Sequence, residues 1–220
     1  EAFPSGDLFI KPAFSNGGKG CMLYTRELNG YRKSDGIFIS RRNLFDKLYS
    51  RSQFETLLIQ SRIRNHDYLE ELGFTTLSTV RVLSAIDRQG YVIILRALFK
   101  VPLENMIIDN LGAGGIGCPV DLNSGRLCEG FRKDSSFPLE HHPDTGLFFN
   151  SVQLPMWKNV LELAIQAHRF FPGVPFIGWD IAITKEGCVL VEGNSFPAVE
   201  SIQQAHGPLL SDELFRSIFL

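Results

Sequence analysis

The segment from Phe176 to Asn194 constrains the fold of this chain more than any other. It reads Phe-Ile-Gly-Trp-Asp-Ile-Ala-Ile-Thr, then Lys-Glu-Gly, then Cys-Val-Leu-Val-Glu-Gly-Asn. Two runs rich in β-branched residues around a short turn predict a β-hairpin, with Gly187 in the left-handed position of the turn. The sequence therefore predicts a mixed α and β fold that contains an antiparallel sheet.

The predicted turn also fixes which residues of the two strands face each other. Pairing Thr184 with Cys188 across a three-residue loop and counting outward places Asp180 opposite Glu192. Asn194 then lies on the same face, two residues further along. The other face is expected to be the buried one, and it carries Ile181, Ile183, Val189 and Val191.

Two directly opposed carboxylates need compensating positive charge, because their Cβ atoms lie roughly 5 Å apart. Mg²⁺ prefers oxygen ligands and keeps positions for water and phosphate oxygens. Asp180, Glu192 and Asn194 are therefore candidate magnesium ligands. The alternative is a solvated hairpin whose acids face water or pair with Arg or Lys. The hairpin alone does not separate these two interpretations, and the wider pattern favours the metal.

A glycine-rich segment follows the first predicted strand. Ser15-Asn16-Gly17-Gly18-Lys19-Gly20 stands between apolar runs at residues 7–11 and 21–25. A P-loop would lead into a helix, so this pattern predicts a hairpin loop that covers phosphates with backbone N–H groups. Lys11, at the end of its strand, is expected to reach a phosphate, and Lys19 to assist. An ordinary mobile turn is the alternative.

Alternating strand and helix signals extend along the rest of the chain. The division near Thr56 predicts a small lobe, residues 1–56, and a larger catalytic lobe, residues 57–220. A long surface loop is expected at residues 132–146. Besides those already named, the predicted strands cover residues 37–40, 56–61, 77–85, 91–100, 115–121, 176–184 and 188–193, and the predicted helices cover residues 41–50, 66–72, 154–171 and 208–220.

Composition excludes several classes of function. Lys and Arg total 22 against 24 Asp and Glu, so the net charge of −2 gives no basic footprint for nucleic acid. The four cysteines are far apart and predict neither disulfides nor a zinc site, which favours a cytoplasmic location. No apolar run of about 18 residues predicts a membrane span.

Taken in order, these segments resemble the ATP-grasp superfamily. The resemblance rests on the strand-end lysine, the glycine-rich loop, the hairpin, and four segments between them: 57–61, 78–82, Arg96 and 109–115. It is closest to the glutamate-ligase-like branch, which includes alpha-L-glutamate ligase-related and sugar-transfer-associated ATP-grasp proteins. The resemblance implies an α+β fold of two lobes, with antiparallel sheets and flanking helices, that grip ATP between them.

The resemblance also implies roles for individual residues. Residues 60–63 would form the strand whose backbone pairs with adenine, although Gln60 stands where Glu is common, and Asp67 or Asn65 would approach the ribose. Glu192 would bridge two metal ions. The implied ATP-binding residues are Lys11, Ser15, Gly17, Gly18, Lys19, Gln60, Ser61, Ile63 and Asp67; the catalytic ones are Arg81, Arg96 and Asn110; the metal ligands are Asp180, Glu192 and Asn194. Alternatively, these residues have purely structural roles: the two arginines lie on the sheet surface and Asn110 forms a turn.

The implied activity is that of a carboxylate–amine ligase that forms a carbon–nitrogen bond through an acyl phosphate. It needs ATP and one or two Mg²⁺ ions, for which Mn²⁺ can substitute, and it serves polysaccharide or amino-acid conjugate biosynthesis. Its partners are a small carboxylate and an amine, and relatives also carry a domain before the first strand, so an N-terminal domain or a second subunit is expected. A small-molecule kinase and a non-catalytic nucleotide-binding module are the rival functions.

Overall fold

The computed structural model describes residues 5–15, 17–104, 106–133, 135, 137–211 and 213–219. The chain forms two compact units, Glu1–Ile63 and Arg64–Leu220. The strand that follows Thr56 pairs with the first strand of the chain, so it belongs to the first unit. The division therefore falls after Ile63, and not near Thr56 as expected.

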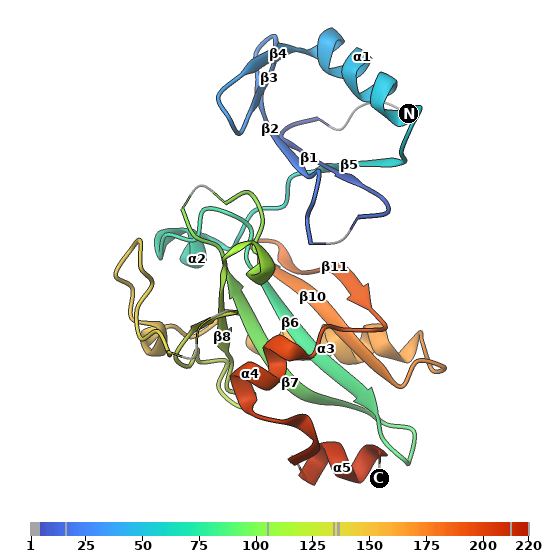
Figure 1. Ribbon diagram of the computed structural model, residues 1–220, viewed down its shortest axis with the longest axis vertical. Helices are drawn as coiled ribbons and strands as arrows, with labels where there is room; N and C mark the ends of the chain where they lie inside the picture. Colours follow the sequence, from blue (N-terminus) through green and yellow to red (C-terminus); the bar gives the residue numbers. More distant parts are fainter. Residues whose placement is uncertain are drawn as a thin grey trace. The chain divides into compact units, whose positions relative to one another are not determined.

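The first unit is an antiparallel sheet covered on one face by a helix (Figure 1). The strand order is β4-β3-β2-β1-β5, and Ser40 caps α1 by accepting a hydrogen bond from the backbone of Asn43. Alternate residues of β1 and β2 pack against Leu44 and Leu48 of α1. The elements are β1 (Leu8–Pro12), β2 (Met22–Glu27), β3 (Gly30–Lys33), β4 (Phe38–Ser40), α1 (Arg41–Ser52) and β5 (Leu57–Ser61).

The second unit is built on a six-stranded antiparallel sheet of order β11-β10-β6-β7-β8-β9. Its strands are β6 (Thr79–Ile86), β7 (Val92–Val101), β8 (Ile116–Pro119), β9 (Phe131–Arg132), β10 (Phe176–Thr184) and β11 (Gly187–Asn194). Its helices are α2 (Asp67–Glu71), α3 (Trp157–Arg169), α4 (Glu200–His206) and α5 (Glu213–Phe219), with single 3-10 turns η1 (Leu111–Ala113), η2 (Phe149–Ser151) and η3 (Leu209–Ser211).

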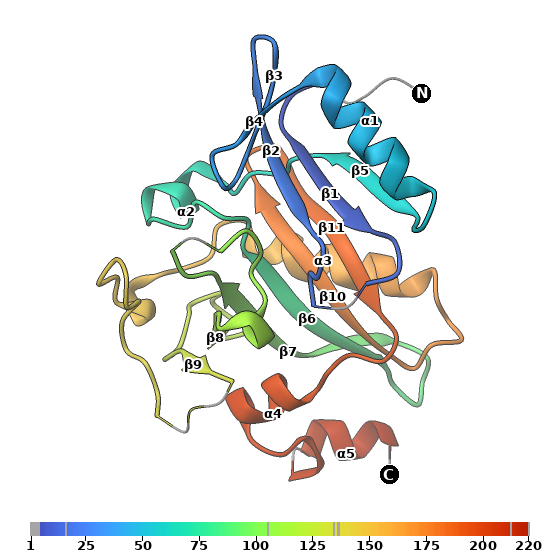
Figure 2. The same cartoon turned by 45° about the horizontal axis from the view of Figure 1, so that its top comes forward.

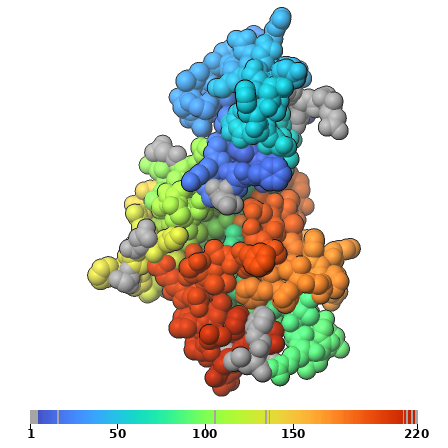
Figure 3. All heavy atoms as spheres, turned by 45° about the vertical axis from the view of Figure 1, so that its right-hand side comes forward, coloured from blue at the N-terminus to red at the C-terminus, as the bar shows by residue number. Residues whose placement is uncertain are grey.

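Both faces of this sheet are covered by apolar packing. On one face α3 crosses behind the strands (Figure 2) and packs Val160 and Ala164 against Val80 and Ile181. On the other face α4 contributes Ile202 to a second cluster. In the space-filling view the C-terminal segment, in red, lies beside the orange β10–β11 hairpin (Figure 3). The central strands are therefore buried on both sides, so a polar side chain within them requires a partner.

The predicted helices are present, with different ends. The helix expected at residues 154–171 begins at Trp157, after Met156 in the left-handed conformation. The one expected at residues 208–220 divides into η3 and α5. The short elements β3, β9 and α4 were not predicted, because each holds at most seven residues and carries little periodicity. No helix in the described ranges is long and apolar enough to cross a membrane.

The segment expected to be a surface loop at residues 132–146 is partly buried. His142 is only 3% exposed. Its Nδ1 accepts a hydrogen bond from the backbone of Asp144, and its Nε2 lies 3.3 Å from the carbonyl oxygen of Pro102. The expectation was wrong for this residue because His142 closes the turn that follows it and packs on the core. Residues 134 and 136 lie outside the described residues.

Candidate functional site

A row of polar side chains crosses the sheet of the second unit. Asp180 of β10 pairs with Glu192 of β11 on one side and with Arg81 of β6 on the other. Directly paired residues in a sheet point to the same face. These three side chains therefore lie together, on the face opposite to α3.

The pairing of Asp180 with Glu192 is the predicted one, but the turn is different. Thr184 pairs with Gly187, so the loop is one residue shorter than expected. A bulge after Asp180 adds one residue to β11 and restores the predicted register. The predicted buried face of β11 is accordingly wrong at Val189, which is 37% exposed.

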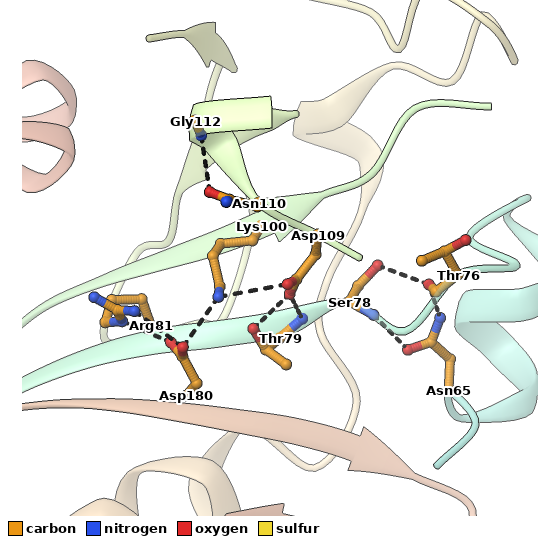
Figure 4. A network of polar contacts seen from close by, with 10 residues as sticks. All are labelled: Asn65, Thr76, Ser78, Thr79, Arg81, Lys100, Asp109, Asn110, Gly112 and Asp180. Atoms are coloured by element: carbon orange, nitrogen blue, oxygen red, sulfur yellow. Dashed lines mark hydrogen bonds and ion pairs between the residues drawn. The ribbon is translucent and has the colours of Figure 1, made fainter. Parts of the chain in front are cut away.

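Asp180 is held by two cations. Arg81 donates from Nε to Oδ1 over 2.6 Å and from Nη2 to Oδ2 over 2.9 Å, and Lys100 donates from Nζ to Oδ2 over 3.1 Å (Figure 4). The side chain of Asp180 is 7% exposed and that of Arg81 is 18% exposed. A bidentate pair with this geometry and burial fixes both side chains.

The charges of this pair reinforce each other. Burial raises the pKa of Asp180, but Lys100 and Arg81 outweigh burial and bring that pKa below its ordinary value. Burial likewise lowers the pKa of Arg81, and the carboxylates of Asp180, Glu192 and Asp109 more than reverse the effect. Both groups therefore remain ionised at neutral pH.

Lys100 connects this pair to a further carboxylate, Asp109. Asp109 Oδ2 accepts hydrogen bonds from the backbone nitrogen and Oγ1 of Thr79 over 2.7 and 2.5 Å, and its Oδ1 lies 3.5 Å from Lys100 Nζ (Figure 4). No role was predicted from the sequence for Lys100, Thr79 or Asp109. Lys100 lies on the same face as Arg81, because it is two residues beyond Leu98, the partner of Arg81.

The donor set fits a magnesium ion. The side chains of Glu192 and Asn194 make no hydrogen bond or ion pair within the described part of the chain. Asp180 uses three of the roughly four acceptor positions of a carboxylate and keeps one on Oδ1. No group of three His, Cys, Asp or Glu side chains suited to a metal occurs among the described residues. Asn194 lies two residues beyond Glu192 on the same face, and its amide oxygen is a ligand type that Mg²⁺ accepts.

Three other candidate residues have structural partners. Asn110 caps η1, because its Oδ1 accepts from the backbone of Gly112 over 2.9 Å. Asp67 forms an exposed ion pair with Lys185 at 2.9 Å. Asn65, the alternative for the ribose, is 3% exposed, and its amide group bonds to the backbone of residues 74, 76 and 78. Asn110 thus forms the turn that the alternative interpretation expects, and its catalytic role stays a prediction. Asn65 holds the backbone of three residues together.

Arg96 lies on the same face as Arg81, since its partner Leu83 is two residues beyond Arg81. Its Nη1 donates to the carbonyl of Leu95 over 2.7 Å, and burial lowers its pKa. His206, at the end of α4, lies 3.2 Å from the carbonyl oxygen of Ala97 and within electrostatic reach of Arg96. The second unit thus brings Arg81, Arg96 and the three metal candidates onto one face of its sheet.

His206 makes stability depend on pH. Burial lowers the pKa of His206 below its ordinary value. The hydrogen bond to Ala97 raises this pKa in part, and the charge of Arg96 lowers it further. Because the unfolded chain binds the proton more readily, this contribution to stability is present above about pH 6.5 and is lost as the pH falls. We expect His206→Gln to weaken the decline in the free energy of unfolding between pH 7 and pH 5, measured by urea titration. Identical pH dependence in both proteins would contradict this.

In the first unit two of the predicted nucleotide residues, Lys11 and Gln60, share one face of the sheet. Lys11 pairs with Leu58, and Gln60 pairs with Phe9. The intervening residues Leu8 and Ile10 pack on α1, so Lys11 and Gln60 face away from the helix. The side chain of Ser61 points to the helix face, because Ser61 pairs with Leu8.

Strand β5 is the edge of its sheet, and among the described residues no other strand pairs with its outer side. Hydrogen bonds from Ala13 N to Thr56 O and from Arg62 N to Asp7 O show which residues turn inward to β1. Alternation along an antiparallel pair then turns the polar groups of Ile59 and Ser61 outward. In the strand predicted to bind adenine, the backbone of Ser61 is therefore accessible at the sheet edge. The side chain of Gln60 is accessible on the face that lies opposite to α1. Ile63 follows the end of β5.

The glycine-rich loop joins β1 to β2, as predicted. Gly17, Gly18 and Gly20 have φ values of 66°, 73° and 77°, a region that side chains other than glycine rarely adopt. Ser15 Oγ donates to the carbonyl of Lys19 over 2.7 Å, and the side chain of Lys19 is exposed. Asn16 lies outside the described residues. The glycines are thus required by the shape of the loop.

One of the comparisons with known proteins identifies the family of the chain. A search of curated protein sequences found no match. A family model described as sugar-transfer associated ATP-grasp matches residues 2–217, nearly the whole chain. This confirms the predicted superfamily and the α+β fold, in which both sheets are antiparallel. The chain belongs to the sugar-transfer associated ATP-grasp family, whose chemistry is ATP-dependent and ligase-like and whose superfamily generally binds ATP and Mg²⁺.

Proposed function

We propose that this chain is a carboxylate–amine ligase of the carbon–nitrogen bond-forming class, which acts through an acyl phosphate. The observation that carries the proposal is the row from Glu192 through Asp180 to Arg81, which joins candidate metal ligands to a buried cation. Magnesium bound there would neutralise phosphate charge and orient the phosphates. Asp180, Glu192 and Asn194 would hold it.

The residues of the sheet face support two successive steps. In the first, an oxygen of the substrate carboxylate attacks the γ-phosphorus of ATP, and ADP leaves. In the second, an amine attacks the acyl carbon, loses a proton, and inorganic phosphate leaves. Both steps develop negative charge on oxygens, and fixed guanidinium groups such as Arg81 and Arg96 stabilise it. The family is described as associated with sugar transfer, and we propose a sugar-linked precursor as one substrate. The widely separated cysteines favour a reaction in the cytoplasm.

The first unit supplies the nucleotide contacts in this proposal. Lys11 binds a phosphate as a compact point charge, and the loop after it covers the phosphates with backbone N–H groups. The outward backbone of Ser61 accepts and donates hydrogen bonds to the adenine edge, and the side chain of Gln60 lies beside it.

Lys11→Ala is expected to weaken nucleotide binding more than Lys19→Ala. Lys11 stands on a strand that is paired on both sides, whereas Lys19 is exposed in a loop and must be ordered when the nucleotide binds. The dissociation constant of a non-hydrolysable ATP analogue, measured by calorimetry with Mg²⁺, compares the two. Equal or reversed effects would assign the phosphate contact to the loop.

Trapping with hydroxylamine separates the proposal from its rivals. An acyl phosphate reacts with hydroxylamine to give a hydroxamate, so a panel of amino acids and sugar acids with ATP and Mg²⁺ should include one that yields it. A small-molecule kinase would instead release a stable phosphorylated product, and a binding module would release neither. ATP consumption that yields a stable phosphorylated product without hydroxamate would overturn the ligase assignment.

A further inference from the structure

The ion pairs of Asp180 have a consequence for metal binding. Arg81 and Lys100 together place three N–H donors on this carboxylate, and the Lys100 side chain is 13% exposed. A divalent cation bound to Asp180 would share the carboxylate with two positive groups, and like charges at such short range repel strongly. The site as it stands therefore opposes a free metal ion.

Releasing Asp180 to a metal would not remove this opposition. Arg81 and Lys100 would then lose their partner while still mostly buried, and a buried charge without a partner is strongly unfavourable. Lys100 would keep only Asp109, whose Oδ1 is 3.5 Å away and whose Oδ2 is already engaged by Thr79. Asp109 thus positions Lys100 but does not replace the hydrogen bond and the ion pair that Lys100 would lose with Asp180.

A polyphosphate changes this balance, because its oxygens accept hydrogen bonds from both guanidinium and ammonium groups. Arg81 and Lys100 can then exchange Asp180 for phosphate oxygens while Asp180 turns to the cation. Each buried charge keeps a partner throughout the exchange. One donor of Lys100 also has no acceptor among the described residues, which leaves it available for a ligand oxygen.

We propose that Arg81 and Lys100 make divalent-cation binding at Asp180, Glu192 and Asn194 conditional on a polyphosphate, so that the site takes the metal–nucleotide complex and rejects the free ion. This inference rests on the metal assignment of the proposed function. Coupling of this kind is reciprocal, so the cation must raise the affinity for nucleotide by the same factor, typically about 5 to 150-fold. Lys100, for which the sequence predicted no role, thus determines the specificity of the site for the metal–nucleotide complex over the free ion.

The test measures binding and needs no turnover. Mn²⁺ affinity without nucleotide is measured by electron paramagnetic resonance for the wild type and for Lys100→Met. The variant should bind free Mn²⁺ about tenfold more tightly, because one of the two competing cations is gone. Lys158→Met is the matched control: it removes the same charge from an exposed position on α3, on the other side of the sheet, and should behave as wild type.

The second measurement is the affinity for a non-hydrolysable ATP analogue with and without saturating Mn²⁺. The dissociation constant without Mn²⁺, divided by the one with Mn²⁺, should be large in the wild type and in Lys100→Arg, which keeps the charge. The same ratio should be several-fold smaller in Lys100→Met. Adding Glu192→Gln to Lys100→Met should abolish the gained Mn²⁺ binding, since the ion would lose a ligand. Circular dichroism establishes that each variant is folded, and Lys100→Gln replaces the methionine variant if that one is not.

The outcomes separate the inference from the proposed function. Equal free Mn²⁺ affinity in the wild type and Lys100→Met, in proteins that bind nucleotide, would overturn the inference and leave the function standing. Mn²⁺ binding in Lys100→Met that survives the addition of Glu192→Gln would overturn both the inference and the metal assignment, because the ion would lie elsewhere. A folded wild type that binds no nucleotide with Mn²⁺ would count against the proposed function itself.

Discussion

Glu192→Gln is expected to lower kcat by about 10² to 10³ while leaving the melting temperature nearly unchanged. The carboxylate faces Asp180 across the hairpin, shares its face with Asn194 and has no hydrogen bond or ion pair among the described residues. Its charge is therefore available for a cation, and the fold should lose only the electrostatic contribution of Glu192 to Arg81. Phosphate release from ATP, with the acceptor or as background hydrolysis, gives the rate.

Glu186→Gln in the turn of the same hairpin is the control. It makes the same chemical change six residues away, and the hydrogen bonds of Glu186 with Thr184 lie within the turn. Its turnover should match the wild type. Near wild-type activity in Glu192→Gln would refute the metal assignment, and a collapsed melting temperature would show that Glu192 stabilises the fold.

Arg81→Met is expected to destabilise the second unit by about 3 kcal/mol or more and to abolish turnover. The substitution leaves Asp180 buried with Lys100 as its remaining partner, and breaking one side of a buried pair typically costs about 3 to 5 kcal/mol. Urea unfolding measures the stability. The effect should exceed that of removing any exposed ion pair, such as the one between Asp67 and Lys185.

A double-mutant cycle with Asp180→Asn isolates the pair. The double variant should be more stable than the sum of the two single changes predicts, because it removes both buried charges. Strictly additive losses would mean that Arg81 stabilises the unit by packing of its side chain and that the ion pair contributes little.

The sequence predicted most of what depends on local pattern. The hairpin of β10 and β11, the glycine-rich loop and helix α3 each follow from turn residues and periodicity within a single short segment. The facing of Asp180 and Glu192 was also predicted, although it holds only because the shorter turn and the bulge offset each other. A register counted from a turn type is therefore correct only when bulges are known.

What the sequence did not predict depends on which strands are neighbours. Asp180 meets Arg81 because β10 lies beside β6, a pairing between residues 99 positions apart that no local signal encodes. The same neighbourhood brings Lys100 to Asp180, so its role was missed although its strand was predicted. Asn110, in contrast, was assigned a catalytic role by family likeness, and its side-chain oxygen caps a 3-10 turn.

The central claim is that this chain binds ATP together with a divalent cation, and thermal unfolding tests it most directly. At about 100 times the dissociation constant, ATP with Mg²⁺ should stabilise the protein by about 2.7 kcal/mol, which corresponds to a rise in melting temperature of roughly 5 to 10 °C. Chelation of the metal with EDTA should remove the rise, because the carboxylates and the polyphosphate are linked through the ion. A folded protein whose melting temperature does not change with ATP and Mg²⁺ would contradict the account.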